Sequence, residues 1–281
     1  MNIAIVSALA VWGVGWFVNA RLAAVGAQNN VIRLLVPAIF GLTLLIMWEM
    51  LVRMLGISPI ILPAPTAIAD RFGSSLPILW ADFEQTIIKG AMTGYIIGAV
   101  FAFGVAILAD RSDFLTRGIL PVGGFMAALP IVGIAPIFVK WLGSDWQSKA
   151  AVVAVMVFFP ILVNIVAGLR DTSAMQRDLM RTYGAGYWQT LFKLRLPAAM
   201  PFIFNGLKIA TTLALIGAIV AEFFGSPTVG MGFRISTSVG RLALDMVWAE
   251  IVVAAIAGST LYGAVAWIEG RVTFWHPSQR K

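Results

Sequence analysis

Long apolar runs recur along the chain and constrain its fold more than any other feature. Seven stretches of 18 to 27 residues hold at most two charged side chains each; they cover residues 3–20, 34–51, 86–109, 120–141, 150–169, 198–224 and 247–268. A hydrocarbon core about 30 Å thick is crossed by about 20 helical residues. Because backbone polar groups inside a bilayer must bond to one another, each run is expected to be helical. The sequence therefore predicts an all-α polytopic membrane protein.

The composition excludes the usual soluble classes and most catalytic chemistry. Hydrophobic residues make up 60% of the chain and charged residues 12%, against ~25% charged residues in ordinary soluble domains. The chain has no cysteine and a single histidine, His276, which excludes disulfides, Cys nucleophiles and histidine-based metal sites or triads. It also lacks any Gly-Lys pair, so it has no phosphate-binding loop. We expect no catalytic residue, no metal site and no cofactor bound by this chain.

Basic residues between the runs predict the orientation in the membrane. If the loop 170–197 is cytoplasmic, the loops on its side carry twelve Lys and Arg residues and the opposite loops carry six. This excess places the C-terminus in the cytoplasm if all seven runs span. The net charge of +7 then reflects contacts with the membrane surface rather than with nucleic acid. Run 3–20 has no positive segment before it, which favours a transmembrane helix over a signal peptide.

The segment 170–197 is the most specific feature of the sequence. It is expected to stay outside the bilayer, yet it is rich in large apolar side chains: Leu179, Met180, Tyr183, Tyr187, Trp188, Leu191 and Phe192. The spacing of four from residue 179 to residue 191 predicts one shared helical face. Gly184 and Gly186 are expected to divide the segment into two short helices, and Leu196-Pro197 to end the second. Such a helix pair needs a cover, either the lipid surface or a cytoplasmic protein.

The same segment resembles the cytoplasmic loop of the permease subunits of bacterial ABC importers. That loop has the pattern Glu-Ala-Ala, three residues, Gly, nine residues, Ile-x-Leu-Pro. Here Asp178-Leu179-Met180, Gly184 and Leu194-Arg195-Leu196-Pro197 stand at the same spacing, with other residues at the Glu, Ala and Ile positions. The resemblance implies a coupling contact with a separate ATPase. Its expected residues are Arg177, Asp178, Leu179, Met180, Tyr183, Gly184, Tyr187, Trp188, Leu191 and Pro197.

Further stretches resemble the nitrate, sulfonate and taurine-type members of that family, in the same order along the chain. They are residues 62–66, 130–136 with 141–143, 158–160 with Asn164 and Gly168, and Glu222 with 230–232. The resemblance implies a type I ABC importer transmembrane domain with six core helices plus one extra N-terminal helix. It also implies three kinds of partner: a second permease copy, two cytoplasmic ATP-binding subunits that hold ATP and magnesium, and a periplasmic substrate-binding protein. The chain itself is then expected in the inner membrane of a bacterium.

The runs and the resemblance together suggest three regions along the chain. Residues 1–30 are expected to form the extra transmembrane helix. Residues 31–85 are expected to hold the first core helix and a periplasmic amphipathic segment, in which Ile68, Phe72, Leu76, Leu79 and Trp80 share a face. Residues 86–275 form the expected core permease domain, including the loop 170–197.

Polar and helix-breaking residues inside the runs mark a candidate translocation path. Its members are Pro130, Pro136, Asn164, Asn205, Lys208 and Glu222. Lys208 either attracts an anionic solute or extends to the cytoplasmic head groups. Glu222 is expected to pair with Arg234 or Arg241, or to form an external gate contact. The prolines either line the path or kink the helices.

Other functions compete with an ATP-driven permease. An ion-coupled secondary transporter is the main alternative, and it predicts inverted repeats and a midplane ion site. A membrane enzyme would need a nucleophile with a base or a metal cluster. A lipid-surface scaffold would leave the Gly and Leu-Pro spacing unexplained. The resemblance implies a small solute, either a nitrate-, sulfonate- or taurine-like anion or a neutral pyrimidine-like compound.

Overall fold

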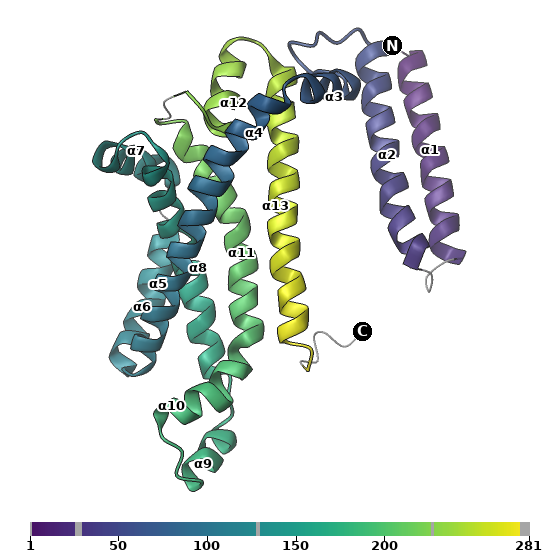
Figure 1. Cartoon of the computed structure of the whole chain (residues 1–281). Coiled ribbons are helices and arrows are strands. Elements are labelled where there is room, and N and C mark those ends of the chain that lie inside the picture. The colour runs from purple at the N-terminus through teal and green to yellow at the C-terminus, as the bar shows by residue number, and fades with distance from the viewer. Residues whose placement is uncertain (1, 26–29, 128–129, 226–227, 276–281) are drawn as a thin grey trace. The chain divides into compact units, whose positions relative to one another are not determined.

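The computed structural model describes residues 2–25, 30–127, 130–225 and 228–275, and these residues are almost entirely helical (Figure 1). His276 lies outside the described residues. The chain divides into two compact units, one of Met1–Pro77 with Thr237–Ile251 and one of Ile78–Ser236 with Val252–Lys281. Within the described part of the chain, six helical stretches are long and apolar enough to cross a membrane. The predicted all-α polytopic fold is confirmed.

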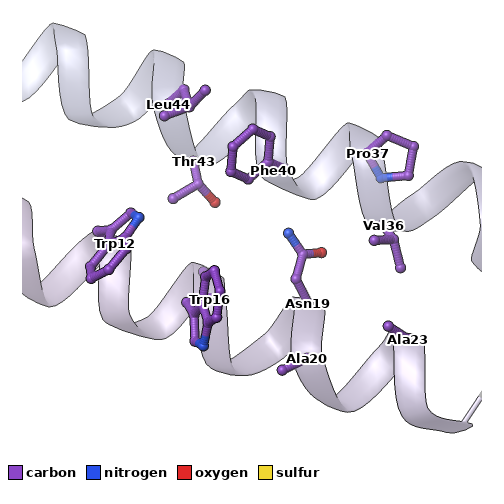
Figure 2. A pocket seen from close by; sticks show the side chains of 11 residues that line it. Trp12, Trp16, Asn19, Ala20, Ala23, Val36, Pro37, Phe40, Thr43 and Leu44 are labelled. Carbon is purple, nitrogen blue, oxygen red and sulfur yellow. The ribbon is translucent and has the colours of Figure 1, made fainter.

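The first unit is built on a hairpin of two apolar helices, α1 (Asn2–Val25) and α2 (Asn30–Met54). The extra N-terminal helix expected from run 3–20 is present, and its apolar stretch extends to Ala24. Gly15 allows the helices to approach closely, because a Cβ there would lie 2.5 Å from the Thr43 side chain. Figure 2 shows Trp12, Trp16 and Asn19 of α1 facing Phe40 and Thr43 of α2 across a cavity of about 370 Å³.

Further helical segments belong to this unit, among them α3 (Pro65–Ser74) and the start of α13 (Leu244–Val272). Helix α3 begins with a proline in its first turn, where no backbone N–H is required. Glu49 of α2 accepts hydrogen bonds from the backbone N–H and the hydroxyl of Thr66, at 3.0 and 2.8 Å, and so joins α2 to α3. At the start of α13, Trp248 lies 4.8 Å from Trp48 between ring centroids.

The expected amphipathic segment is divided differently in the structure. Helix α3 ends at Ser74, and Leu76, Leu79 and Trp80 belong to the next span. That span joins α4 (Leu76–Phe83), the π-helix η1 (Glu84–Met92) and α5 (Thr93–Asp110) into one 35-residue helix. The expected start at residue 86 is therefore ten residues late. The apolar stretch before it extends the helix, and Pro77 lies in the first turn, where it is tolerated.

The expected run 120–141 is two helices rather than one. Helix α6 (Asp113–Ala127) and helix α7 (Ile131–Leu142) are inclined to each other by 93°. Pro130 stands immediately before α7 in an extended conformation, with φ −69° and ψ 119°. Proline has no backbone N–H with which to continue a helix, and α7 begins immediately after it. Counting the bent pair as a span gives seven, as the sequence predicts.

The core of the second unit lies between α5, α8 (Trp146–Arg170) and α11 (Leu196–Glu222). Asp145 caps α8 by accepting a hydrogen bond from the backbone N–H of Trp146 at 2.7 Å. This bond and a second one from Gln85 lower the pKa of Asp145 below its usual value. Most buried side chains of α8 are Val, Ile or Leu, whereas those of α11 are mostly small, which allows α8 and α11 to approach closely.

Gly98 is expected to be essential for the packing of α5 on α8. A Cβ at Gly98 would lie 2.4 Å from the Val157 side chain and 2.6 Å from the Ala154 carbonyl oxygen. Gly98→Ala should therefore lower the free energy of unfolding by about 1–3 kcal/mol, as overpacking does. Thermal unfolding in detergent micelles measures this change.

Gly104 of the same helix is the matched control. No described atom lies within 4 Å of a Cβ built there. Gly104→Ala should leave stability unchanged or raise it by about 0.5–1 kcal/mol through helix propensity. Equal unfolding temperatures for the two variants would contradict the assigned contact.

Candidate functional site

The segment after α8 forms the expected pair of short helices (Figure 1). Helix α9 (Ala174–Thr182) begins with a capping box, in which Ser173 and Gln176 each bond the other's backbone N–H. Gly184 then turns the chain with φ +67°, a left-handed conformation that suits glycine. Helix α10 (Tyr187–Thr190) follows. The predicted division at Gly184 and Gly186 is confirmed.

The second short helix does not end where the sequence predicts. The π-helix η2 (Leu191–Arg195) continues α10 directly into α11, and residues Tyr187–Glu222 form one 36-residue helix. Pro197 lies in the first turn of α11 and does not stop it. A π-turn widens the helix locally and accommodates the missing N–H of a proline. The end of the segment is thus rigidly continuous with a membrane span.

The apolar side chains of the segment do not share one face. Leu179 and Tyr183 are 55% and 79% exposed, whereas Tyr187 is half-buried and Leu191 is 1% exposed. The turn at Gly184 separates the two pairs, so the spacing of four does not continue through it. The segment therefore has an outer half on α9 and an inner half on α10 and η2, where Tyr187 and Leu191 face inward while Trp188 and Phe192 are 49% and 57% exposed.

Asp110, at the end of α5, anchors the inward half. Its carboxylate accepts hydrogen bonds from both terminal nitrogens of Arg195 at 2.5 and 2.7 Å, and from the Tyr187 hydroxyl at 2.9 Å. Arg195 also donates from Nε to the carbonyl of Leu169, at 3.0 Å. Sequence reasoning missed Asp110, because 85 residues separate it from Arg195.

A stacked cation strengthens the same junction. The guanidinium of Arg111 lies 4.8 Å from the centroid of the Tyr187 ring and 4.6 Å from that of Trp188. Such cation–π contacts contribute about 0.5–1 kcal/mol each at exposed sites. The sequence signal for this junction is the charged pair Asp110-Arg111, which directly follows the apolar run 86–109.

The remaining expected coupling residues lie on α9 or beside it. Arg177 donates to the carbonyl oxygen of Thr172, and Asp178 pairs with Arg181 at 3.2 Å on an exposed surface. Met180 is half-buried. The polar side chains thus fix the start of α9 and its solvent face, while Leu179 and Tyr183 remain uncovered by the chain itself.

Three of the six expected path residues lie close together. Asn205 of α11 donates to Asn164 of α8 at 3.1 Å, and Asn164 donates in turn to the carbonyl of Pro160 at 2.8 Å. One helical turn along α11, Lys208 forms an ion pair with Glu269 of α13 at 2.7 Å. Neither expectation for Lys208, that it attracts an anionic solute or that it extends to the head groups, included this partner.

The other path residues lie elsewhere in the unit. Pro130 stands immediately before α7 and Pro136 lies within it, and both are exposed. Glu222 is at the far end of α11 and belongs to a separate polar cluster. The structure therefore supports a polar site around Lys208 and does not join these three residues to it.

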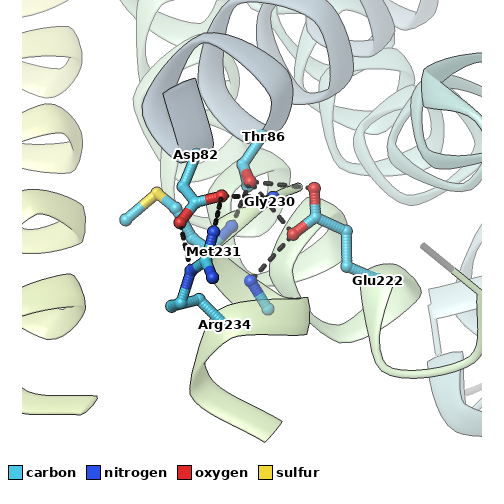
Figure 3. A network of polar contacts seen from close by, with 7 residues as sticks. Asp82, Thr86, Glu222, Gly230, Met231 and Arg234 are labelled. Carbon is cyan, nitrogen blue, oxygen red and sulfur yellow. Dashed lines mark hydrogen bonds and ion pairs between the residues drawn. The ribbon is translucent and has the colours of Figure 1, made fainter. Parts of the chain in front are cut away.

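The polar cluster around Glu222 links three helical segments (Figure 3). The Thr86 hydroxyl lies 2.8 and 3.0 Å from the two carboxylate oxygens of Glu222 and accepts from the N–H of Met231 at 2.8 Å. Gly232 donates its N–H to Glu222 at 2.8 Å. The start of α12 (Met231–Gly240) is thereby bonded to η1 and to the end of α11.

Asp82 extends this cluster. It accepts hydrogen bonds from the N–H of Gly230 at 2.6 Å and from Nε of Arg234 at 2.7 Å, and its side chain is fully buried. The expected pairing of Glu222 with Arg234 is wrong, because Arg234 reaches Asp82 instead. Lys149 was also missed: it is 1% exposed and donates to the carbonyl oxygens of Ser144 and Gly225.

Comparisons with known proteins place these features in a family. Residues 94–274 match the family described as binding-protein-dependent transport system inner membrane component. A probable ABC transporter permease protein of Haemophilus influenzae is 30% identical over 84% of this chain and 96% of its own length.

Two further relatives carry substrate names. The formylaminopyrimidine transport permease protein ThiX of Halalkalibacterium halodurans is 30% identical over 86% of this chain and 96% of its own length. The putative aliphatic sulfonates transport permease protein SsuC of Bacillus subtilis is 27% identical over 87% of each chain.

The match and the six apolar helices of the described residues identify a multi-pass inner membrane protein of the importer class. This family assignment argues against the ion-coupled secondary transporter. Among the described residues, no group of three His, Cys, Asp or Glu side chains could hold a metal ion. The chain belongs to the binding-protein-dependent transport system inner membrane component family, the transmembrane permeases of type I ABC importers.

Proposed function

We propose that this chain is the translocating subunit of an ATP-driven importer and moves its solute by alternating access. Two copies would form the pathway, and α9 of each would dock on one of two separate ATPase subunits that bind ATP and magnesium. A periplasmic binding protein would deliver the solute. The C-terminus would then lie in the cytoplasm, on the side of the coupling segment, α9 to η2.

The single observation that carries this proposal is the asymmetry of the coupling segment. Its outer half presents Leu179 and Tyr183 to solvent. The lipid cannot readily cover them, because the charged side chains Arg177, Asp178 and Arg181 on the same helix oppose burial in the membrane. Its inner half is fastened to α5 by Asp110 and continues without a break into α11. A push on α9 is therefore transmitted to a membrane span rather than absorbed by a loose loop.

The solute is proposed at the level of a class. The named relatives transport formylaminopyrimidine and, putatively, aliphatic sulfonates. We propose a small organic or inorganic solute of that size for this chain.

Removing the outer side chains of α9 should abolish docking without unfolding the protein. Leu179→Ala with Tyr183→Ala is expected to lower ATPase copurification and ATP-driven uptake at least about tenfold, because desolvated aromatic anchors carry much of an interface's energy. Both side chains are exposed, so thermal unfolding of the isolated chain should change little. Copurification, vesicle uptake and unfolding measured on one preparation test this.

A matched control removes two exposed apolar side chains from the middle of a span. Ile96→Ala with Val100→Ala alters α5, where these residues are 54% and 65% exposed. This variant should keep full ATPase binding. If the α9 variant also keeps its ATPase and transports normally, the proposed coupling role is wrong.

A further inference from the structure

A pocket of about 380 Å³ lies beside α11 within the second unit, a volume in the range of small-molecule sites. It is lined by Asn205, Lys208, Ile209, Thr212, Leu213 and Tyr262. Four of these six side chains are polar, although α11 and α13 are both long and apolar enough to span the membrane. Polar side chains inside a membrane face a protein interior or a water-filled path rather than lipid. The polar lining therefore indicates a site on a solute pathway.

The charge of this pocket is cancelled from within the chain. Lys208 Nζ lies 2.7 Å from Glu269 Oε2, and the two side chains are only 21% and 11% exposed. An anion that bound Lys208 would have to displace Glu269. It would leave that carboxylate mostly buried without its partner, which is strongly unfavourable. A simple anion is thus a poor occupant.

The remaining wall offers neutral hydrogen bonding beside an aromatic ring. Asn205 donates from Nδ2 to Asn164, which fixes the amide and directs its oxygen as an acceptor. Thr212 adds a hydroxyl, and Tyr262 adds a phenol and a ring face. Ile209 and Leu213 complete the wall with apolar surface. These groups fit a flat solute with both donors and acceptors at its edge.

We propose that this pocket is a transit site for an uncharged, planar, hydrogen-bonding heterocycle, and that the Lys208–Glu269 pair excludes simple anions. The inference rests on the proposed transport function and specifies its solute class. Glu269 acts as a specificity-determining residue through Lys208, while Asn205 and Thr212 contact the solute.

The test measures the binding of two probes, one neutral and one anionic, to the full chain in nanodiscs. 4-Amino-2-methylpyrimidine at pH 8 represents the neutral heterocycle, and methanesulfonate represents the simple anion. The wild-type chain is expected to bind the pyrimidine and not the sulfonate. Asn205→Leu should weaken pyrimidine binding about tenfold, because it removes one hydrogen-bonding group.

Glu269→Gln is the sharper variant, because it frees the lysine. It should gain methanesulfonate binding by at least about tenfold, the effect expected when a charged partner is exchanged for a neutral one. Glu84→Gln is the matched control: Glu84 also pairs with a lysine, Lys89 at 2.9 Å, but on an exposed surface away from the pocket lining. It should gain nothing. The double variant Lys208→Gln with Glu269→Gln restores neutrality and should bind only the pyrimidine.

Three results would overturn the inference: sulfonate binding by the wild type, no pyrimidine binding by the wild type, or equal affinities in wild type and Asn205→Leu. Such results alongside ATP-driven uptake that depends on Leu179 and Tyr183 would refute the pocket alone. Intact pyrimidine binding in a chain that needs no ATPase for uptake would refute the proposed function instead.

Discussion

Asp110→Ala is expected to lower the free energy of unfolding by about 3–5 kcal/mol, the usual cost of removing one partner from a buried ion pair. The Asp110 side chain is 7% exposed and that of Arg195 is 16% exposed, so the guanidinium would lose its charge partner in a poorly hydrated place. The Tyr187 hydroxyl would lose its acceptor in the same step. The coupling segment would then be attached to the membrane helices mainly through the chain itself.

The same variant should also uncouple ATP hydrolysis from transport. With its inner half released, the segment can follow the ATPase without moving α11. We therefore expect ATP hydrolysis to continue in the reconstituted complex while solute uptake falls at least about tenfold. A tenfold fall corresponds to a shift of about 1.4 kcal/mol in the conformational equilibrium that couples the two. Parallel measurement of hydrolysis and uptake in proteoliposomes separates this outcome from a failure to assemble.

Asp178→Ala provides the control for Asp110→Ala. Asp178 also pairs with an arginine, Arg181, but the two side chains are 68% and 80% exposed. Exposed pairs contribute about 0–1 kcal/mol, so the unfolding temperature should hardly change. If Asp110→Ala lowers the unfolding temperature no more than Asp178→Ala does, and its uptake stays coupled to ATP hydrolysis, the anchoring role of Asp110 is refuted.

The fold could be predicted from the sequence to the extent that composition determines it. Within the described residues the predicted runs lie mainly on helix, because a bilayer leaves an apolar stretch of this length little alternative, although run 120–141 is divided between α6 and α7. Two predicted boundaries were wrong for different reasons. The span expected from residue 86 starts at Leu76, because the apolar residues before 86 continue the helix. The stop expected at Leu196-Pro197 is absent, because Pro197 lies in a first helical turn after a π-turn, and sequence alone does not show which prolines are accommodated in this way.

In the candidate site, local features could be predicted from the sequence, whereas contacts between distant residues could not. The turn at Gly184 followed from local spacing and is confirmed. The partners of Lys208, Arg195 and Arg234 are carboxylates 61, 85 and 152 residues away. Only the packing of helices brings such pairs together, so the sequence position of a charged residue does not show which carboxylate it pairs with.

Gly232→Ala should release the start of α12 (residues 231–236) from the rest of the second unit. A Cβ at Gly232 would lie 2.1 Å from the carbonyl oxygen of Ile219 and 2.9 Å from Cβ of Glu222, and a backbone oxygen cannot rotate away. Moving α12 outward breaks the bond from the Gly232 N–H to Glu222 and the bond from Met231 to Thr86. We expect a loss of about 3 kcal/mol or more, because overpacking adds to buried polar groups left unsatisfied.

Limited trypsin digestion in detergent can detect this release directly. Arg234 is held by Asp82 in the intact cluster, so cleavage after Arg234 should be slow in the wild type and at least about tenfold faster in Gly232→Ala, since cleavage reports the population of the opened state. Gly240, at the other end of α12, is the matched site, because a Cβ there meets no described atom within 4 Å. Gly240→Ala should digest like the wild type. Equal protection of Arg234 in all three proteins would mean that α12 does not depend on this contact with Glu222 and Ile219.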